Sequence, residues 1–591
     1  MKQVSPLRFC MLNVLVWTLW GRYVLAAERT LIASDALNYS SFNTGLNWDD
    51  AQAPKAGNTY VVPGGRTLRT PVSGNHAFAG DGLEIAGTLL WKGPDNASVT
   101  ITNLVLRGSL NQGQPNSTAR IYGNILIPDD ASATISLGTD QNDRRQFQIY
   151  APLSGTGSVK LFMPRNSSPM KEVQLAAANT NFSGAITLVG KGKLTLSNEN
   201  NLGGNPPFWN PAQLSMNGSV LRFSSTLTLD DPNRGIWLSN QTATADDIYP
   251  GGRFEVGNGV VATVGCVIGG EGPLEKTDVG TLILAAENTY VGATTVANGT
   301  LLVNSATNAT VSLLVSPSAT LGGTGTLHCA VTVAPGGAIT LAGNGYGTFT
   351  LAHETGLNLD GATLSFDAQA VVDGPTDCLA LGGPLTLSGA GTVSVNIPAA
   401  GLPAGLYTLV TYPSISGNGT LVMSYPYPNA ELVIGDTAIT LEVSGSGATR
   451  DMVWKGNASD NTWAFAAGNW LPEDAVFING VDVRFDDTGV ASVPVVLSAD
   501  AAPRDIAIDT STKTYALGAG AYVLSARNVT KTGNAALTLK GDHRYASLTI
   551  GQASGTSGTG GGACTVSNAL DISGSMTVFP SAGTFTQGDR S

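Results

Sequence analysis

The feature that most constrains this chain is a segment that nearly repeats itself. Residues 274–304 read LEKTDVGTLILAAENTYVGATTVANGTLLVN, and residues 173–198 read VQLAAANTNFSGAITLVGKGKLTLSN. A looser third copy begins at Val529. Short alternating apolar strands separated by Asn and Gly turns, recurring within one chain, indicate a β-solenoid. With single-residue slips at the turns, the matched positions are Leu284 with Leu175, Asn288 with Asn179, Gly292 with Gly184, Gly299 with Gly192 and Leu301 with Leu194.

The composition agrees with a solenoid. Glycine accounts for 73 of the 591 residues, and only 13% of residues are charged, about half of the roughly 25% usual in a soluble domain. Tight turns need residues that tolerate positive φ, and stacked rows of neutral Thr, Ser and Asn avoid like-charge repulsion. The formal net charge is −12 and Lys and Arg do not cluster, so we expect no nucleic-acid partner.

Strand signals dominate the chain, and helix signals are nearly absent. Apolar or alternating runs such as Leu301–Val303 and Val393–Val395 are short, and Asn-Gly pairs such as Asn298-Gly299 mark turns. These pairs would also suit the two-residue hairpins of an antiparallel sandwich or propeller. The Gly-punctuated run of short strands, without paired lengths, favours a parallel coil instead. We therefore predict an all-β parallel β-helix.

The N-terminus has the pattern of a targeting signal. Lys2 and Arg8 precede an apolar run from Phe9 to Trp20, and small residues around Ala27 suit cleavage. The run is short for a bilayer span of roughly 20 residues. We predict a signal peptide over residues 1–27 and no membrane span in the mature chain.

Two Trp-bearing segments, one around Trp48 and one around Trp470, suggest two tandem modules. A Gly- and Ser-rich stretch at residues 444–449 has the composition of a linker. We predict a first module over 28–445 and a second over 450–591. The second is much shorter and stops amid strand-like sequence without an obvious cap, so we expect it to be truncated.

Cysteine usage does not suggest a disulfide framework. Four cysteines remain after the signal, far apart and without a CxxC pair: Cys266, Cys329, Cys378 and Cys564. Each lies among Val, Thr, Ala or Leu, as a small buried hydrophobe on a strand would. We favour free thiols, and the disulfide state stays open.

The segment from Lys276 to Leu301 closely resembles the autotransporter-associated β-strand repeat. The usual form of that repeat is KxGxGTLxLxGxNTYxGxTxxxxGxL, and it is matched except that Asp278 and Ala286 replace two glycines. The match is specific near 274–304 and looser at the other copies. The repeat-defining residues are Lys276, Gly280, Leu282, Leu284, Asn288, Tyr290, Gly292, Gly299 and Leu301.

The resemblance implies a right-handed parallel β-helix displayed outside the cell. It implies no particular chemistry, because this repeat is a unit of folding and export. An autotransporter would also carry a C-terminal translocator of alternating strands with aromatic girdles. Gly588–Ser591 lack that pattern, so self-transport by this polypeptide is not expected.

No residue pattern points to catalysis, a metal or a cofactor. Neighbouring acidic residues such as Asp486-Asp487 point to opposite faces of a strand, and most such pairs stand near Pro or Gly, as in turns. The four histidines have no zinc-ligand spacing, and no GxSxG elbow occurs. We assign no catalytic, metal or cofactor residue and favour a protein that is not an enzyme.

Tryptophan is frequent for a chain with so few aromatic residues. Exposed rings on a solenoid flank could stack on sugars, because their apolar faces match the C–H surfaces of pyranoses. Trp48, Trp91 and Trp470 are the candidates for such stacking. The favoured alternative is that the Trp rings plug a solenoid end or join the modules.

We therefore predict an exported β-helix protein, at the cell surface or secreted, with a structural or adhesive role. Its partner would be a cell-surface ligand or an extracellular polysaccharide. The alternative function is binding or degradation of a polysaccharide on the same flank. Clustered carboxylates in a groove would favour hydrolysis, and a flat Thr/Asn face would favour adhesion. Ligand, export route and oligomeric state stay open.

Overall fold

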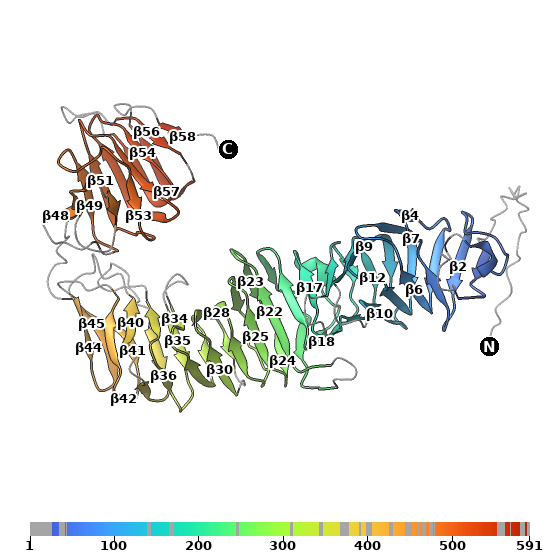
Figure 1. Ribbon diagram of the computed structural model, residues 1–591. Coiled ribbons are helices and arrows are strands. Elements are labelled where there is room, and N and C mark those ends of the chain that lie inside the picture. The colour runs from blue at the N-terminus through green and yellow to red at the C-terminus, as the bar shows by residue number, and fades with distance from the viewer. Residues whose placement is uncertain are drawn as a thin grey trace, which may run out of the picture. The chain divides into compact units, whose positions relative to one another are not determined.

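The structure is a computed structural model of the chain (Figure 1). It describes residues 27–34, 42, 44–138, 144–164, 171–243, 248–307, 311–341, 347–366, 378–388, 392–396, 405–424, 430–443, 452–457, 461–463, 469–471, 477, 479–551, 562–567, 569–579 and 585–587. The chain forms two compact units. Unit 1 comprises Met1–Ile186 and Asn200–Gly204, and unit 2 comprises Thr187–Glu199 and Asn205–Ser591.

Unit 1 is a coil of short parallel strands that form two sheets. The first sheet contains β1 (Ala27–Thr30), β2 (Asn58–Val62), β4 (His76–Ala77), β5 (Gly82–Ile85), β7 (Ser98–Leu106), β9 (Ser117–Leu126), β11 (Arg145–Ile149), β12 (Leu153–Gly155), β14 (Glu172–Leu175) and β15 (Asn181–Phe182). The second contains β3 (Thr67–Arg69), β6 (Thr88–Trp91), β8 (Ser109–Gln112), β10 (Ser132–Ser136) and β13 (Ser158–Phe162). Two short 3₁₀ helices, η1 (Gly45–Asn47) and η2 (Glu199–Leu202), and β16 (Ile186–Val189) are also described.

Unit 2 continues the same construction with three faces. The first face contains β17 (Lys193–Leu196), β19 (Val220–Phe223), β22 (Gly252–Val256), β25 (Leu274–Thr277), β27 (Thr294–Val296), β30 (Ser312–Val315), β33 (Ala330–Val333), β36 (Leu357–Leu359), β39 (Leu385–Leu387) and β42 (Ile415–Gly417). The second contains β20 (Leu227–Leu229), β23 (Val261–Val264), β26 (Thr281–Leu284), β28 (Gly299–Val303), β31 (Ala319–Gly322), β34 (Ala338–Thr340), β37 (Thr363–Ser365), β40 (Thr392–Asn396) and β43 (Thr420–Met423).

The third face is made of two sheets. One contains β18 (Asn210–Asn217), β21 (Arg234–Leu238) and β24 (Ile268–Gly270), and the other contains β29 (Ala306–Thr307), β32 (Thr326–Leu327), β35 (Thr348–Leu351), β38 (Cys378–Leu381), β41 (Gly405–Thr411), β45 (Ala438–Val443) and β44 (Ala430–Ile434). From β30 to β41 the strands visit the first, second and third face in turn, as a solenoid requires.

The last part of unit 2 contains two further sheets. One contains β48 (Trp470–Leu471), β46 (Met452–Trp454), β49 (Val483–Asp486), β51 (Asp505–Asp509), β53 (Val523–Thr532), β55 (Asp542–Ile550) and β57 (Leu570–Val578). The other contains β47 (Thr462–Trp463), β50 (Val495–Leu497), β52 (Tyr515–Ala519), β54 (Leu537–Leu539), β56 (Cys564–Val566) and β58 (Phe585–Gln587). Neighbouring strands are again parallel, except β46 with β48.

The core is a stack of like residues from successive turns of the coil. Leu282 is paired with Leu301, 19 positions later, and both side chains are fully buried. Alternate residues face outward and are Thr, Ser, Asn or charged, because successive side chains on a strand point to opposite faces. Burial of the aliphatic rows contributes roughly 25 cal/mol per Å² of apolar surface removed from water. One copy of the sequence repeat, residues 274–304, therefore extends over more than one coil turn, because Leu282 and Leu301 both belong to it.

The all-β parallel solenoid predicted from the sequence is confirmed, and the antiparallel alternative is excluded for the described sheets. Antiparallel pairing is confined to β41–β45–β44 and β46–β48 and an occasional bridge. The right-handedness of the coil and the division into two modules stay predictions. The proposed linker at 444–449 and the signal peptide up to Ala26 lie outside the described residues.

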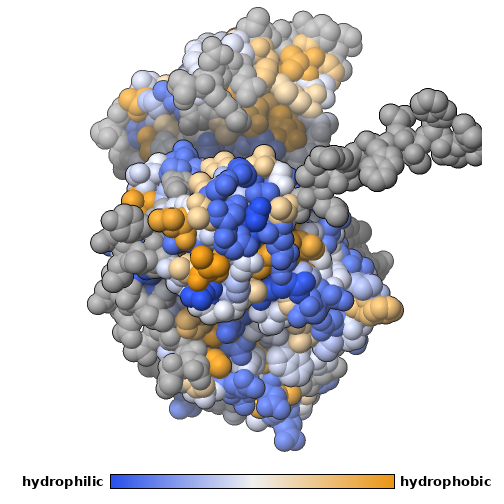
Figure 2. Space-filling model, turned by 90° about the vertical axis from the view of Figure 1, so that its right-hand side faces the viewer, coloured by the Kyte–Doolittle hydropathy of each residue, from blue (hydrophilic) through white to orange (hydrophobic). Residues whose placement is uncertain are grey.

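Apolar residues that do reach the surface are mostly dispersed. Leu46 and Val72 of unit 1 are more than half exposed, and on the face that Figure 2 shows, hydrophobic residues form small groups separated by polar ones. Scattered exposure of this kind is normal for a soluble surface. No helix in the described part of the chain has the length and apolar character needed to cross a membrane.

Candidate functional site

Lys276 is the repeat residue with the most specific environment. It ends up fully buried in β25, and its ammonium donates to the carbonyl oxygens of Thr277 at 2.9 Å, Asp278 at 2.7 Å and Asn298 at 3.1 Å. The first two acceptors belong to its own turn, and the third belongs to the turn of the next coil. Burial lowers the pKa of Lys276 to about 8, and the nearby Asp278 carboxylate opposes that shift. The side chain therefore clamps two successive turns together.

The third sequence copy has the part of this arrangement that lies within one turn. Lys531 is fully buried, and its ammonium donates to the carbonyl oxygens of Thr532 and, at 3.0 Å, Gly533. Gly533 has φ +74°, and Asp278 at the matching position has φ +63°. The left-handed turn explains why the usual repeat has glycine where this chain has Asp278, since Asp is one of the few other residues that tolerate that region.

Asn288 fastens one coil turn to the one before it. The side chain is fully buried, and its amide oxygen accepts the backbone N–H of Ile268 at 2.9 Å. Asn179, its counterpart in the first copy, is also buried and accepts the N–H of Leu153 at 2.7 Å. The sequence alignment of the two copies thus corresponds to one shared hydrogen bond between coil turns.

The remaining repeat-defining residues pack the corners and the core. A Cβ on Gly280 would lie 2.2 Å from the Gly257 carbonyl oxygen, and a Cβ on Gly292 would lie 2.1 Å from that of Gly272. Tyr290 is buried, and its hydroxyl lies 2.8 Å from the Thr294 hydroxyl. Burial raises the pKa of Tyr290. Gly299 has φ +68°, and Leu282, Leu284 and Leu301 are fully buried. We therefore treat the repeat as a folding unit.

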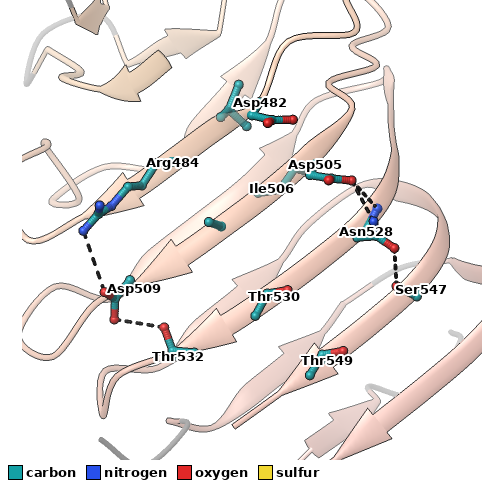
Figure 3. A pocket seen from close by; sticks show the side chains of 12 residues that line it. Asp482, Arg484, Asp505, Ile506, Asp509, Asn528, Thr530, Thr532, Ser547 and Thr549 are labelled. Carbon is teal, nitrogen blue, oxygen red and sulfur yellow. Dashed lines mark hydrogen bonds and ion pairs between the residues drawn. The ribbon is translucent and has the colours of Figure 1, made fainter. Parts of the chain in front are cut away.

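A shallow polar groove lies on the outward face of four parallel strands, β49, β51, β53 and β55 (Figure 3). It encloses about 620 Å³. The register places its side chains in rows that cross the strands: Asp505, Asn528 and Ser547 form one row, Arg484, Ala507, Thr530 and Thr549 the next, and Asp509 and Thr532 the third. The small side chains of Ala507, Thr530 and Thr549 in the middle row form the floor, and the outer rows lie on either side of it.

Hydrogen bonds and an ion pair connect the groove side chains of successive coil turns. Asn528 donates to Asp505 at 2.9 Å, and Ser547 donates to Asn528 at 2.7 Å. Thr532 donates to Asp509 at 2.9 Å, and Arg484 lies 3.7 Å from the same carboxylate. Figure 3 shows these interactions as two lines of contacts on either side of the floor. The arrangement suits a polar ligand in shallow contact, and it stabilises the stack.

The groove carboxylates also bind arginines at the groove margin. Arg504 pairs with Asp482, and Arg527 pairs with Asp505 at 2.9 Å. In each case the arginine of one coil turn reaches the aspartate of the turn before it. A hydrolase would instead need a carboxyl pair free to act as acid and nucleophile or base on one bond. We derive no catalytic step from this face.

Two acidic residues accept backbone N–H groups at turns, Asp50 in its own turn, as predicted, and Asp487 in the next coil turn. Asp487 accepts the backbone N–H groups of Ser511, Thr512 and Lys513, and these bonds lower its pKa to about 2. Asp50 accepts the N–H of Gln52 two residues on. Within the described ranges, no cluster of three or more His, Cys, Asp or Glu could hold a metal ion.

The four cysteines of the described residues are free thiols, as favoured from the sequence. Cys266, Cys329 and Cys564 are buried, and Cys378 is partly exposed. Burial raises the pKa of Cys266 to about 12 and those of Cys329 and Cys564 to about 11. These thiols behave as small core residues.

The three tryptophans considered for sugar stacking have buried indole rings. Trp48 meets Tyr60 edge to face at 4.8 Å between ring centroids, and Trp470 meets Trp454 in the same way at 4.8 Å. Trp91 is 1% exposed and donates from Nε1 to the Gly93 carbonyl oxygen at 3.1 Å. A buried ring presents no face to a glycan, so these three rings are not available for stacking on a sugar.

Sequence reasoning missed the groove and did not separate the exposed tryptophans from the buried ones. The groove residues are ordinary Asp, Asn, Ser and Thr on alternating strands, and only the register of parallel strands brings them together. Trp209 and Trp237 are 48% and 40% exposed. Their one sequence signal is a setting of Pro, Asn and Ser, which the buried Trp segments share in part.

Comparisons with known proteins match the same repeat. Residues 274–303 match the family of passenger-associated transport repeats. A stretch of 178 residues, 28% of this chain, is 31% identical to the adhesin BmaC autotransporter of Brucella suis biovar 1 (strain 1330). The chain spans about 5% of the length of that curated relative.

The coil of parallel strands defines a β-solenoid that contains a repeat of the autotransporter-passenger kind at residues 274–303. Both similarities indicate an exported protein, at the cell surface or in the extracellular space.

Proposed function

We propose that this protein is a structural and adhesive element outside the cell. The observation that carries the proposal is the passenger-associated transport repeat at 274–303, set in a stack of parallel strands. The similarity to an autotransporter adhesin over 178 residues supports the adhesive part. We infer that the whole protein adheres to a cell-surface ligand.

The fold suits this function mechanically. Parallel ladders of backbone hydrogen bonds place successive coil turns about 4.8 Å apart. Outward rows of Thr, Ser, Asn and paired charges repeat at that spacing, as in the groove on β49 to β55. Many weak polar contacts at a regular spacing give strong attachment together, because binding of each further site becomes intramolecular.

Two measurements test the proposal. Antibodies against the mature chain should label intact cells of the source organism as strongly as permeabilised ones. Beads coated with the purified protein should adhere to target cell layers, whereas beads coated with serum albumin should not. Labelling only after permeabilisation would refute surface display, and equal adhesion of both bead types would refute the adhesive role.

A further inference from the structure

Two tryptophans stand apart from the rest by their exposure. Of the seven in the described part of the chain, Trp48, Trp91, Trp454, Trp463 and Trp470 are buried, whereas Trp209 and Trp237 are 48% and 40% exposed. Phe208, next to Trp209, is 81% exposed. Trp209 directly precedes β18 and Trp237 lies on β21, and these two strands are paired. We call Phe208, Trp209 and Trp237 the aromatic strip.

The segment that carries Phe208 and Trp209 is held in place by Asn233. The backbone N–H of Asn233 donates to the Asn205 side chain at 3.1 Å, and its amide donates to the Pro206 carbonyl oxygen at 2.8 Å. Asn210 then donates its backbone N–H to the Asn233 carbonyl oxygen at 3.0 Å. Both ends of the segment are thus tied to the turn before β21. The exposed rings are therefore presented on a fixed backbone.

A break in the strand register lies beside the strip. The pairing of β18 with β21 shifts between Asn210 and Leu214. Pro211 lies over Gly235 there, where a Cβ would come within 2.5 Å of the Pro211 Cα. Bulges of this kind re-aim side chains and are frequent next to functional sites. Asn210, which follows Trp209, is paired with Arg234. Arg234 is three residues before Trp237, a separation of about 10 Å along the strand.

Small, uncharged residues flank Trp237 in its row across the sheet. Its partners are Ser215 on β18 and Gly269 on β24. The ring lies against Gly269, where a Cβ would be 3.5 Å from the ring and 3.3 Å from the Thr289 hydroxyl. The indole thus has one side supported by the neighbouring strand while much of it stays open. Hydroxyl groups beside a flat apolar ring are the combination that a pyranose can use, with C–H groups on the ring and hydroxyls around it.

We propose that the aromatic strip binds a neutral polysaccharide by stacking of pyranose rings on Trp237 and Trp209. This proposal names the ligand class for the adhesive role and rests on it. A second protein is the poorer occupant, because the exposed parts of the three rings offer roughly 250–420 Å². A stable protein interface needs about 800 Å² from each partner. The uncharged row around Trp237 favours a neutral sugar over an acidic one.

The test uses the full chain and a panel of neutral hexasaccharides of glucose, N-acetylglucosamine, galactose or mannose. At least one should bind and shift the tryptophan fluorescence. Trp209→Ala and Trp237→Ala should each weaken binding roughly three- to ten-fold, whereas Trp237→Phe should keep most of it. Tyr122→Ala, which removes another exposed ring at 38% exposure, is the matched control and should bind like the wild type.

The proposal is overturned if no hexasaccharide binds at millimolar concentration, or if the Trp209→Ala/Trp237→Ala double variant binds as well as the wild type. The bead assay separates this result from the adhesive role. Equal adhesion of wild-type and double-variant beads would refute a part for the aromatic strip in adhesion and leave adhesion itself standing. Hexasaccharide binding without adhesion of wild-type beads would refute the adhesive role and support the site.

Discussion

Lys276 shows how one buried side chain can hold two turns of a repeat together. A buried ammonium is costly, which is why its pKa falls to about 8. Three carbonyl acceptors from two turns offset that cost. Lys531 repeats the two hydrogen bonds to its own turn, so the Lys-Thr pair of the sequence repeat marks a turn that a buried lysine holds.

We expect Lys276→Met to destabilise the protein by about 1–3 kcal/mol, because three carbonyl oxygens lose a charged donor while the apolar stem is kept. Denaturant unfolding measured by circular dichroism would give the change. Lys160→Met, at an exposed position of β13, is the control and should change stability by less than about 0.5 kcal/mol. Equal effects of the two substitutions would contradict the clamp.

Gly292 is required by the closeness of two coil turns. A Cβ there would lie 2.1 Å from the Gly272 carbonyl oxygen, so Gly292→Ala should cost about 1–3 kcal/mol through overpacking. Gly64→Ala is the matched control, since nothing lies within 4 Å of its Cβ position and its φ is not positive. The control should be neutral or slightly stabilising. Thermal unfolding of both variants checks the prediction, and a harmless Gly292→Ala would refute it.

Cys266 should make stability depend on pH in the alkaline range. Its folded pKa is about 12 against an unfolded value of 9.0, so its contribution is complete below pH 9 and is lost as pH rises toward 12. The loss is up to about 1.4 kcal/mol per pH unit in that window. Between about pH 8 and about pH 11, the unfolding free energy should fall less in Cys266→Ala than in the wild type. Parallel slopes for the two proteins would contradict the assignment.

At the scale of elements, clusters of aromatic rings occupy the first coil turns of each Trp-bearing segment. Phe42, Trp48, Tyr60 and Phe78 pack in unit 1. Trp454, Trp463, Trp470, Phe477, Phe485 and Tyr515 pack in unit 2. Large rings fill the coil where a stack of aliphatic rows begins.

Trp463→Ala should therefore cost about 3–5 kcal/mol, since the fully buried indole leaves a cavity. Hydrogen exchange of β49 and β50 should speed up in this variant. Trp209→Ala, at a half-exposed position, should change stability by less than about 0.5 kcal/mol. Unchanged hydrogen exchange of β49 and β50 in Trp463→Ala would show that the aromatic cluster does not stabilise these strands.

At the scale of the molecule, we propose that residues 28–445 and 450–591 are separate modules. The two sheets that start at β46 contain no strand from before Met452, which supports the proposal. Residues 450–591 expressed alone should give a β-rich circular dichroism spectrum and unfold cooperatively. Residues 480–591, which lack Trp454, Trp463 and Trp470, are the control and should not. If neither fragment folded while residues 28–445 folded on their own, the division would be contradicted.

The sequence determined much of the architecture. Asn179 and Asn288 could be matched because both accept the same buried hydrogen bond from the coil turn before, and Leu175 and Leu284 because both lie in a buried core row. Such local and repeated requirements leave a periodic trace in the residues themselves. The free thiols were predicted for the same reason, since each depends on its immediate neighbours. Asp487 differs, because the N–H groups that it accepts belong to Ser511–Lys513 in the next coil turn.

Only the tertiary structure decided which surfaces can be used. Asp505, Asn528 and Ser547 are far apart in the sequence and meet only through the register of parallel strands. Exposure of Trp209 and Trp237, against burial of Trp48 and Trp470, depends on whether a neighbouring coil turn covers the ring. Burial is a property of the neighbours that stacking supplies, and a residue's own type and local pattern do not specify them.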